Sequence, residues 1–320
     1  QCPHAPDDTM TRRYLLLAII LSLSLSSYAL SEGEIDALNG ILRAWPNLAT
    51  TTPVWNASSM ETACDAPRFF GLICSDDVDP HVIEIIMNVP QIAGTLPSEL
   101  GKLDHLLSMT LWQTGITGTI NPSSFDSPLL ISVTLNSNRF EGSIPAALVA
   151  KPSLRTLKIH ESGLHGHLPA PEAWNKDLVE LDLRLTYMEG NILEAAVKMR
   201  DLEKLSIDGA RFTGSIPESI GDLKKLRTLS LTSFKRLTGT LPASITRLTM
   251  LEELKLHNPA QGRFPDDIGA LSQLKHLSII CPLSGSLPPS IGNLTQLLDL
   301  LLKTITLIGP IPPEIGRLKS

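Results

Sequence analysis

The sequence predicts a solenoid, an elongated domain in which similar coils of chain stack on one another. Three features predict it: a glycine recurs every 23 to 25 residues, a Leu-x-x-Leu-x-Leu element precedes it, and an apolar residue, usually followed by proline, comes two positions after it. Coils that repeat at this period contact only their neighbours and bury their apolar sides by stacking. The ten glycines are Gly94, Gly118, Gly142, Gly166, Gly190, Gly214, Gly239, Gly262, Gly285 and Gly309.

Each coil is expected to contain one short strand and one return segment. In the element that contains Leu154, Leu157 and Ile159, the last two residues alternate with polar neighbours, which is the period of a strand with one buried face. After the glycine come segments such as Ser-Ile-Pro-Glu-Ser-Ile-Gly-Asp-Leu at 215–223. Because proline fixes φ and lacks an N–H donor, this half of the coil is predicted to be extended or a helical turn, outside the sheet.

These residues resemble the plant-type leucine-rich repeat, Leu-x-x-Leu-x-Leu-x-x-Asn-x-Leu-x-Gly-x-Ile-Pro-x-x-Ile-Gly-x-Leu, over about ten copies in residues 82–320. The resemblance implies an α/β solenoid: a right-handed superhelix with a parallel β-sheet on its concave face. In this family a buried asparagine ties adjacent coils together, and here it is present only at Asn138. Thr114, Ser162 and Thr186 occupy equivalent positions and are expected to form a weaker version of its hydrogen bond.

The chain before the cap divides into two segments. Residues 1–9 are interpreted as a non-native leader, and residues 10–29 as a secretory signal peptide, with arginines after Met10, an apolar run and a small-x-small cleavage site. A buried core helix is the alternative. A membrane anchor is disfavoured because the run is shorter than ~20 apolar residues.

Residues 30–81 are predicted to form an amino-terminal cap that covers the first coil. Ser31 and Glu34 form a capping box that begins an amphipathic helix. The segment from Cys64 to Cys74 resembles the cap of plant leucine-rich-repeat proteins, and two cysteines this close in an exported chain are expected to form a disulfide.

Three further residues have local interpretations. Cys281 is expected to be a half-buried apolar residue; a reactive thiol is the alternative. Asn56 and Asn293 stand in Asn-x-Ser/Thr sequons and are predicted glycosylation sites, the second in a return segment away from the sheet.

The concave face carries the candidate binding residues. Side chains that flank the buried strand positions form columns across coils, with strands ~4.8 Å apart. Charges of both signs gather on coils four to six, a second basic group lies on coil eight, and one aromatic residue lies near the start of the face. These residues are Trp112, Lys158, His160, Glu180, Asp182, Arg184, Asp208, Lys255 and His257. They form either a solvated face with cross-strand ion pairs or a recognition patch with Trp112 as its anchor.

Several function classes are disfavoured. A row of side chains on an open sheet offers no water-excluding pocket, and no phosphate-binding glycine loop precedes a lysine, so the chain is predicted not to be an enzyme and to need no cofactor. His165 and His167 are expected to diverge from His160, so no metal site is predicted. A formal charge of −6 gives no bias toward nucleic acid.

The resemblance implies the extracellular ectodomain of a receptor-like kinase or receptor-like protein. Its partners would be a peptide, small-molecule or protein ligand and a co-receptor, bound in the extracellular space or at the outer face of the plasma membrane. Because no capping cysteines follow Gly316, we expect the repeats to continue beyond Ser320 toward a membrane span and a kinase. The alternatives are a secreted protein resembling polygalacturonase inhibitors and a structural wall protein. Charge reversal at Arg184 and Asp208 is expected to abolish binding and leave the fold intact.

Overall fold

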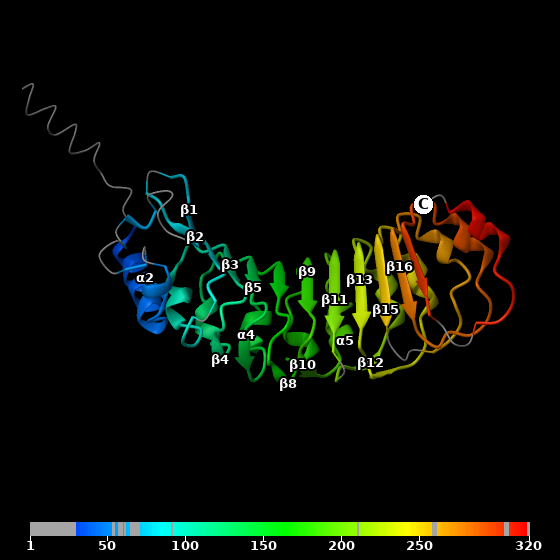
Figure 1. Ribbon diagram of the computed structural model, residues 1–320, viewed down its shortest axis with the longest axis horizontal. Helices are drawn as coiled ribbons and strands as arrows, with labels where there is room; N and C mark the ends of the chain where they lie inside the picture. The colour runs from blue at the N-terminus through cyan, green and yellow to red at the C-terminus, as the bar shows by residue number, and fades with distance from the viewer. Residues whose placement is uncertain are drawn as a thin grey trace, which may run out of the picture.

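A computed structural model describes residues 30–318 except 53–54, 57–59, 61, 65–70, 78, 91, 210, 258–260 and 304–306. The predicted leader and signal peptide lie outside the described residues. The described chain forms an elongated arc, with the cap at one end and the last coil at the other (Figure 1). No helix within these residues is long and apolar enough to cross a membrane.

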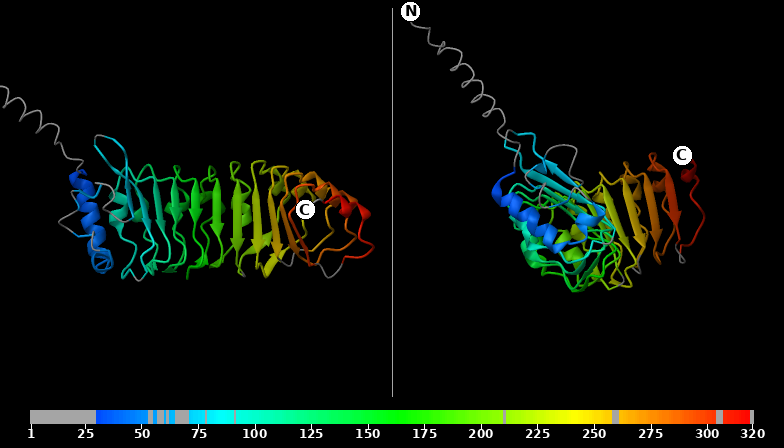
Figure 2. Two further views of the ribbon diagram at one scale, coloured as in Figure 1. Left: turned by 45° about the horizontal axis from the view of Figure 1, so that its top comes forward. Right: turned by 60° about the vertical axis from the view of Figure 1, so that its left-hand side comes forward.

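One sheet of eleven strands runs the length of the arc (Figures 1 and 2). Ten of its strands come one from each coil and pair in parallel, as the repeat predicted, and β1 of the cap pairs antiparallel with β2. In order the strands are β1 (Leu72–Cys74), β2 (Val82–Met87), β3 (Ser108–Leu111), β5 (Ser132–Thr134), β7 (Thr156–Lys158), β9 (Glu180–Leu183), β11 (Lys204–Asp208), β13 (Thr228–Thr232), β15 (Glu253–His257), β16 (His276–Ile280) and β17 (Asp299–Leu302).

The repeated leucines hold this sheet in register. Leu205 and Ile207 of β11 align with Leu181 and Leu183 of β9, and all four side chains are buried. Because side chains alternate along a strand, the residues between these leucines face outward on the concave side. The predicted solenoid with a parallel sheet is therefore confirmed.

A second set of strands, which the sequence did not predict, lies beside the recurring glycines. It forms three two-stranded parallel sheets, and the strands are β4 (Thr117–Thr119), β6 (Arg139–Glu141), β8 (His165–His167), β10 (Tyr187–Glu189), β12 (Thr213–Ser215) and β14 (Arg236–Thr238). All ten recurring glycines have positive φ, between 73° and 129°. At Gly214, for example, a side chain would be strained, and its Cβ would also lie 2.5 Å from Asn191 Cγ. The glycine period thus records a backbone requirement of every coil.

The return segments are mostly 3₁₀ turns, as the prolines predicted. Most of them place an apolar residue such as Ile220 or Ile291 in the core, whereas the segments at 171–173 and 313–317 contain no buried residue. The segments are η2 (Ser98–Lys102), η3 (Pro122–Phe125), α4 (Ala146–Val149), η4 (Pro171–Ala173), α5 (Ile192–Ala196), η5 (Glu218–Asp222), η6 (Ala243–Arg247), η7 (Ile268–Ala270), η8 (Pro289–Asn293) and η9 (Pro313–Arg317).

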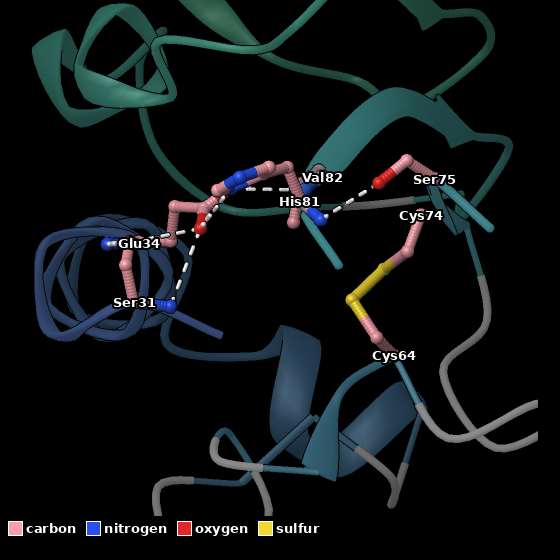
Figure 3. Close-up of a disulfide and its surroundings, with 7 residues drawn as sticks. All are labelled: Ser31, Glu34, Cys64, Cys74, Ser75, His81 and Val82. Atoms are coloured by element: carbon pink, nitrogen blue, oxygen red, sulfur yellow. Dashed lines mark hydrogen bonds and ion pairs between the residues drawn. A yellow bond between two sulfur atoms is a disulfide. The ribbon is translucent and has the colours of Figure 1, made fainter. Parts of the chain in front are cut away.

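The cap closes the first coil. Helix α2 (Glu32–Ala44) begins with the predicted capping box of Ser31 and Glu34, and α3 (Leu48–Thr51) follows it. The buried Trp45 donates a hydrogen bond from Nε1 to the carbonyl oxygen of Thr95, at 2.8 Å. The predicted disulfide between Cys64 and Cys74 is present, with Cα atoms 5.6 Å apart (Figure 3).

The side chain of Asn138 makes four hydrogen bonds, three of which link its coil to the preceding one. Its Nδ2 donates to the carbonyl oxygens of Leu111 and Asn136, at 2.8 and 3.1 Å, and its Oδ1 accepts from the amide and the hydroxyl of Thr114, at 3.2 and 2.6 Å. The expectation for Ser162 and Thr186 was wrong, because their buried hydroxyls have no hydrogen-bond partner. A hydroxyl is too short to span the distance that the asparagine amide spans.

Cys281 is more buried than predicted. Only 4 % of the residue is exposed, and its Sγ lies 3.2 Å from the carbonyl oxygen of Leu256. The thiol is therefore shielded from solvent, which agrees with an apolar packing role.

The last coils expose apolar side chains at the end of the arc. Ile311 is 73 % exposed, although the residues at the same repeat position in earlier coils, such as Ile216 and Phe264, are buried. Leu301 and Ile308, which stand at positions that are polar in the preceding coils, are 50 % and 72 % exposed.

Candidate functional site

The concave face brings the predicted columns together. Lys158 aligns with Asp182 of the next strand, and the column continues through Ser206, Ser230, Lys255 and Ser278. Asp208 lies in the neighbouring column and aligns with Thr232 and His257. The parallel register of the strands therefore converts residues 23 to 25 positions apart into near neighbours.

Glu180 lies between two lysines. Its Oε2 is 3.0 Å from Lys158 Nζ, and its Oε1 is 3.6 Å from Lys204 Nζ. Lys204 was not among the binding residues predicted from the sequence, although the repeat places it beside Glu180 in the same column. Because Glu180 has two cationic partners, it keeps one when the other is removed.

Asp182 and Arg184 form a hydrogen-bonded ion pair on the face. Arg184 donates to both carboxylate oxygens of Asp182, from Nε at 2.9 Å and from Nη2 at 2.6 Å. Residues two apart on a strand point to the same side, which explains why Asp182 of β9 pairs with Arg184, the residue that follows this strand. The hydrogen bonds with Asp182 raise the pKa of Arg184 above its ordinary value, against the opposing effect of burial.

The contact with Asp182 makes Arg184 an unsuitable position for a binding variant. Asp182 is only 7 % exposed, and Arg184 is the partner that neutralises it. Reversing the charge of Arg184 would leave a nearly buried carboxylate beside a second one, which is a strongly destabilising arrangement. The double reversal of Arg184 and Asp208 is therefore not a test that leaves the fold intact.

His160 and Asp208 flank the ion pair. Burial lowers the pKa of His160, while Asp182 raises it and Arg184 lowers it. Asp208 Oδ2 accepts a hydrogen bond of 2.8 Å from Thr232 Oγ1. The face thus presents an imidazole whose neutral form is favoured by burial, next to carboxylates and a guanidinium.

A second cluster lies on β15 and β16. Lys255 forms an ion pair with Glu253, and His257 Nε2 lies 2.7 Å from Ser278 Oγ. Burial lowers the pKa of His257, the charge of Lys255 lowers it further, and Asp208 opposes both.

The shift at His257 predicts a pH dependence of stability. Because its folded-state pKa lies below the ordinary value of 6.5, the unfolded chain binds the proton more readily. The contribution of the neutral imidazole to stability is thus complete above pH 6.5, and it is lost as the pH falls from 6.5 toward the folded-state pKa. An NMR titration should place the His257 midpoint below 6.5. A midpoint above 6.5 would contradict the prediction. The variant His257→Gln should lose less stability than the wild type between pH 7.5 and 5.5.

Trp112 lies apart from the charges. Trp112 is 39 % exposed, and His160 lies two coils further along the same column, about 10 Å away along the sheet. An extended peptide of a few residues spans that distance.

Two hollows that were not predicted from the sequence open where the concave sheet turns toward the small sheets. One, of about 600 Å³, is lined by residues that include Pro90, Gly115 and Arg139. The other, of about 530 Å³, shares Arg139 and includes Leu185 and Tyr187, which are 54 % and 60 % exposed. They were missed because turn positions carry no repeat pattern; Leu185, an apolar residue at a polar position, was the available signal.

These features define the class: the chain is a leucine-rich-repeat protein. The family model described as Leucine Rich Repeat matches residues 201–223, which run from the start of the β11 coil to the end of η5. A comparison of the sequence with curated proteins finds no match.

Among solved structures, the chain is similar to ectodomains of plant receptor kinases. With the Arabidopsis receptor kinase HAESA, in complex with the peptide hormone IDA and the co-receptor SERK1, the TM-score is 0.76 at 25% identity, covering 91% of this chain and 52% of that one. With the plant peptide hormone receptor RGFR1, in complex with RGF2, it is 0.60 at 30% identity, covering 72% and 38%. With the ectodomain of GASSHO1/SCHENGEN3 from Arabidopsis thaliana, in complex with CASPARIAN STRIP INTEGRITY FACTOR 2, it is 0.75 at 24% identity, covering 90% and 34%, which shows the fold alone. The chain spans a third to a half of these proteins' length.

Proposed function

We propose that this chain is the ligand-binding part of an extracellular receptor ectodomain and binds a peptide on its concave face. The observation that carries the proposal is the row of charged side chains on β7, β9 and β11, with the exposed Trp112 on the same face. Support comes from the similar structures, of which one holds a peptide hormone and another is a peptide hormone receptor with its partner.

The chemistry of the face suits a peptide with charges of both signs. Lys158 and Glu180 form a partly exposed ion pair, and surface pairs contribute only ~0.2 to 1 kcal/mol. A ligand carboxylate can therefore replace Glu180 as the partner of Lys158 at little cost. Trp112 offers an aromatic surface of the kind that contributes most to binding. The function is binding and not catalysis.

Secretion and glycosylation belong to the same proposal. Entry into the secretory pathway would use residues 10–29, and attachment to the membrane would use a segment outside this chain. Asn293 is exposed at the end of η8 and is accessible to a glycan, whereas Asn56 is half-buried. A glycan on the return segment leaves the concave face open.

Binding is tested with two variants that spare the fold. We expect Trp112→Ala and Lys158→Ala each to weaken peptide binding by about tenfold or more, because each removes a side chain from the face while Glu180 keeps Lys204. The probes are IDA, RGF2 and CASPARIAN STRIP INTEGRITY FACTOR 2, together with peptides selected from a random display library on the disulfide-bonded chain. Affinity is measured by calorimetry.

The matched control is Lys198→Ala. Lys198 pairs with Glu172 at 3.3 Å, so this change also removes one lysine from a surface ion pair, but outside the concave sheet. Affinity should not change in the control. Peptides that bind the wild type, the control and both concave-face variants equally would place the binding site elsewhere.

A further inference from the structure

A cluster of possible metal ligands lies where the cap meets the first two coils, far from the concave charges. It consists of Glu34 from α2, His81 just before β2 and His105 just before β3, with one ligand atom from each lying within 4.8 Å of the others. Within the described parts of the chain, no other three His, Cys, Asp or Glu side chains meet this closely.

Glu34 is a buried carboxylate with a fixed position. It is 3 % exposed, its Oε1 accepts from the amide of Val82 at 3.0 Å, and its Oε2 accepts from the hydroxyl of Ser31 at 2.8 Å (Figure 3). These bonds hold the carboxylate where its remaining lone pairs face His81.

Glu34 and His81 already have the spacing of two metal ligands. His81 Nδ1 lies 3.1 Å from Glu34 Oε2 (Figure 3). In a tetrahedral zinc site with bonds of ~2.0 to 2.1 Å, neighbouring ligand atoms are about 3.3 Å apart. A divalent ion can therefore take the place of the proton between these two atoms with almost no change in the backbone.

His105 supplies the third ligand. Its ring stacks on His81, with centroids 3.6 Å apart and planes 11° apart. A metal lies near the plane of each imidazole that binds it, so His105 must turn out of the stack to point a nitrogen at the ion. The residue is exposed, which leaves room for that rotation.

We propose that Glu34, His81 and His105 bind a zinc ion or a similar divalent transition metal, with water completing the coordination. Imidazole nitrogen and carboxylate oxygen form a ligand set that zinc accepts. The ion joins α2 to the chain segments before β2 and β3, and so fastens the cap to the first coils. This inference is independent of the proposed function.

The test uses the disulfide-bonded chain without a polyhistidine tag, treated with a chelator and then titrated with zinc chloride by calorimetry. We expect one site per chain, and at least a tenfold weaker affinity in His105→Ala and in His81→Ala. Cobalt(II) should give the visible absorption of a tetrahedral site with the wild type and not with His105→Ala. Zinc should raise the thermal unfolding midpoint of the wild type and not that of His105→Ala.

The control is the double variant His165→Ala/His167→Ala. These exposed histidines lie two apart on β8, on the same side of the strand and away from the proposed site. Their removal should leave zinc affinity unchanged. Three outcomes would each overturn the proposal. They are loss of zinc binding in this control, equal zinc affinity in the wild type and His105→Ala, and no heat of binding when the wild type is titrated with zinc to about 100 µM.

Discussion

Replacing Asn138 by alanine is expected to reduce the free energy of unfolding by about 3 kcal/mol, one of the two largest effects that the structure predicts. The change removes all four hydrogen bonds of the side chain and leaves the carbonyl oxygen of Leu111 and the amide of Thr114 without their partner. Each buried polar group left unpaired costs ~1 to 3 kcal/mol, and no water reaches this site readily because Asn138 is 5 % exposed.

Asn136→Ala is the matched control for this prediction. Asn136 lies in the same coil, is partly exposed, and its side chain accepts a single hydrogen bond of 3.2 Å from the amide of His160. Its loss should cost about 1 kcal/mol or less. Urea unfolding followed by circular dichroism measures both variants, and similar small losses in the two would show that Asn138 does not hold the coils together.

Removing the disulfide through Cys64→Ser together with Cys74→Ser is expected to destabilise the cap by about 2 to 3 kcal/mol. The bond closes a loop across a sequence separation of 10 residues, and its removal returns that loop's conformational freedom to the unfolded chain. Because coils of a solenoid contact only their neighbours, the loss should be local. Trp45 and Trp55, both buried in the cap, report its opening by fluorescence.

Hydrogen exchange locates this effect. Amides of β1 and β2 should exchange faster in the double variant, while those of β11 and β13 keep their protection. Reducing the wild type with dithiothreitol should reproduce the pattern, because the other described cysteine, Cys281, is buried. Equal loss of protection in the central coils would show that the cap and the repeats unfold as one unit.

The binding test differs from the one that the sequence suggested, for a reason that lies in side-chain geometry. The repeat placed Asp182, Arg184 and Asp208 on one face correctly, but it did not reveal which carboxylate Arg184 contacts. Arg184 binds the nearly buried Asp182 with both carboxylate oxygens, whereas Asp208 accepts from Thr232. Lys158 is the better position for a binding variant because Glu180 keeps a second cationic partner, Lys204, when Lys158 is removed.

The sequence by itself determined the parts of this protein that repeat. The leucine positions predicted one strand per coil, the glycine period predicted the number and spacing of the coils, and the capping box and cysteine pair located the cap. These features are local or periodic: each follows from a few neighbouring residues, and stacking then copies it along the arc.

Only the tertiary structure decided which side chains meet. The unpaired hydroxyls of Ser162 and Thr186, the small sheets beside the glycines and the approach of His105 to His81 and Glu34 depend on distances between coils or between cap and coil. Such contacts join residues that no periodic pattern relates, and they are set by side-chain length and rotamer to within about an ångström, the precision that hydrogen bonds and metal bonds require.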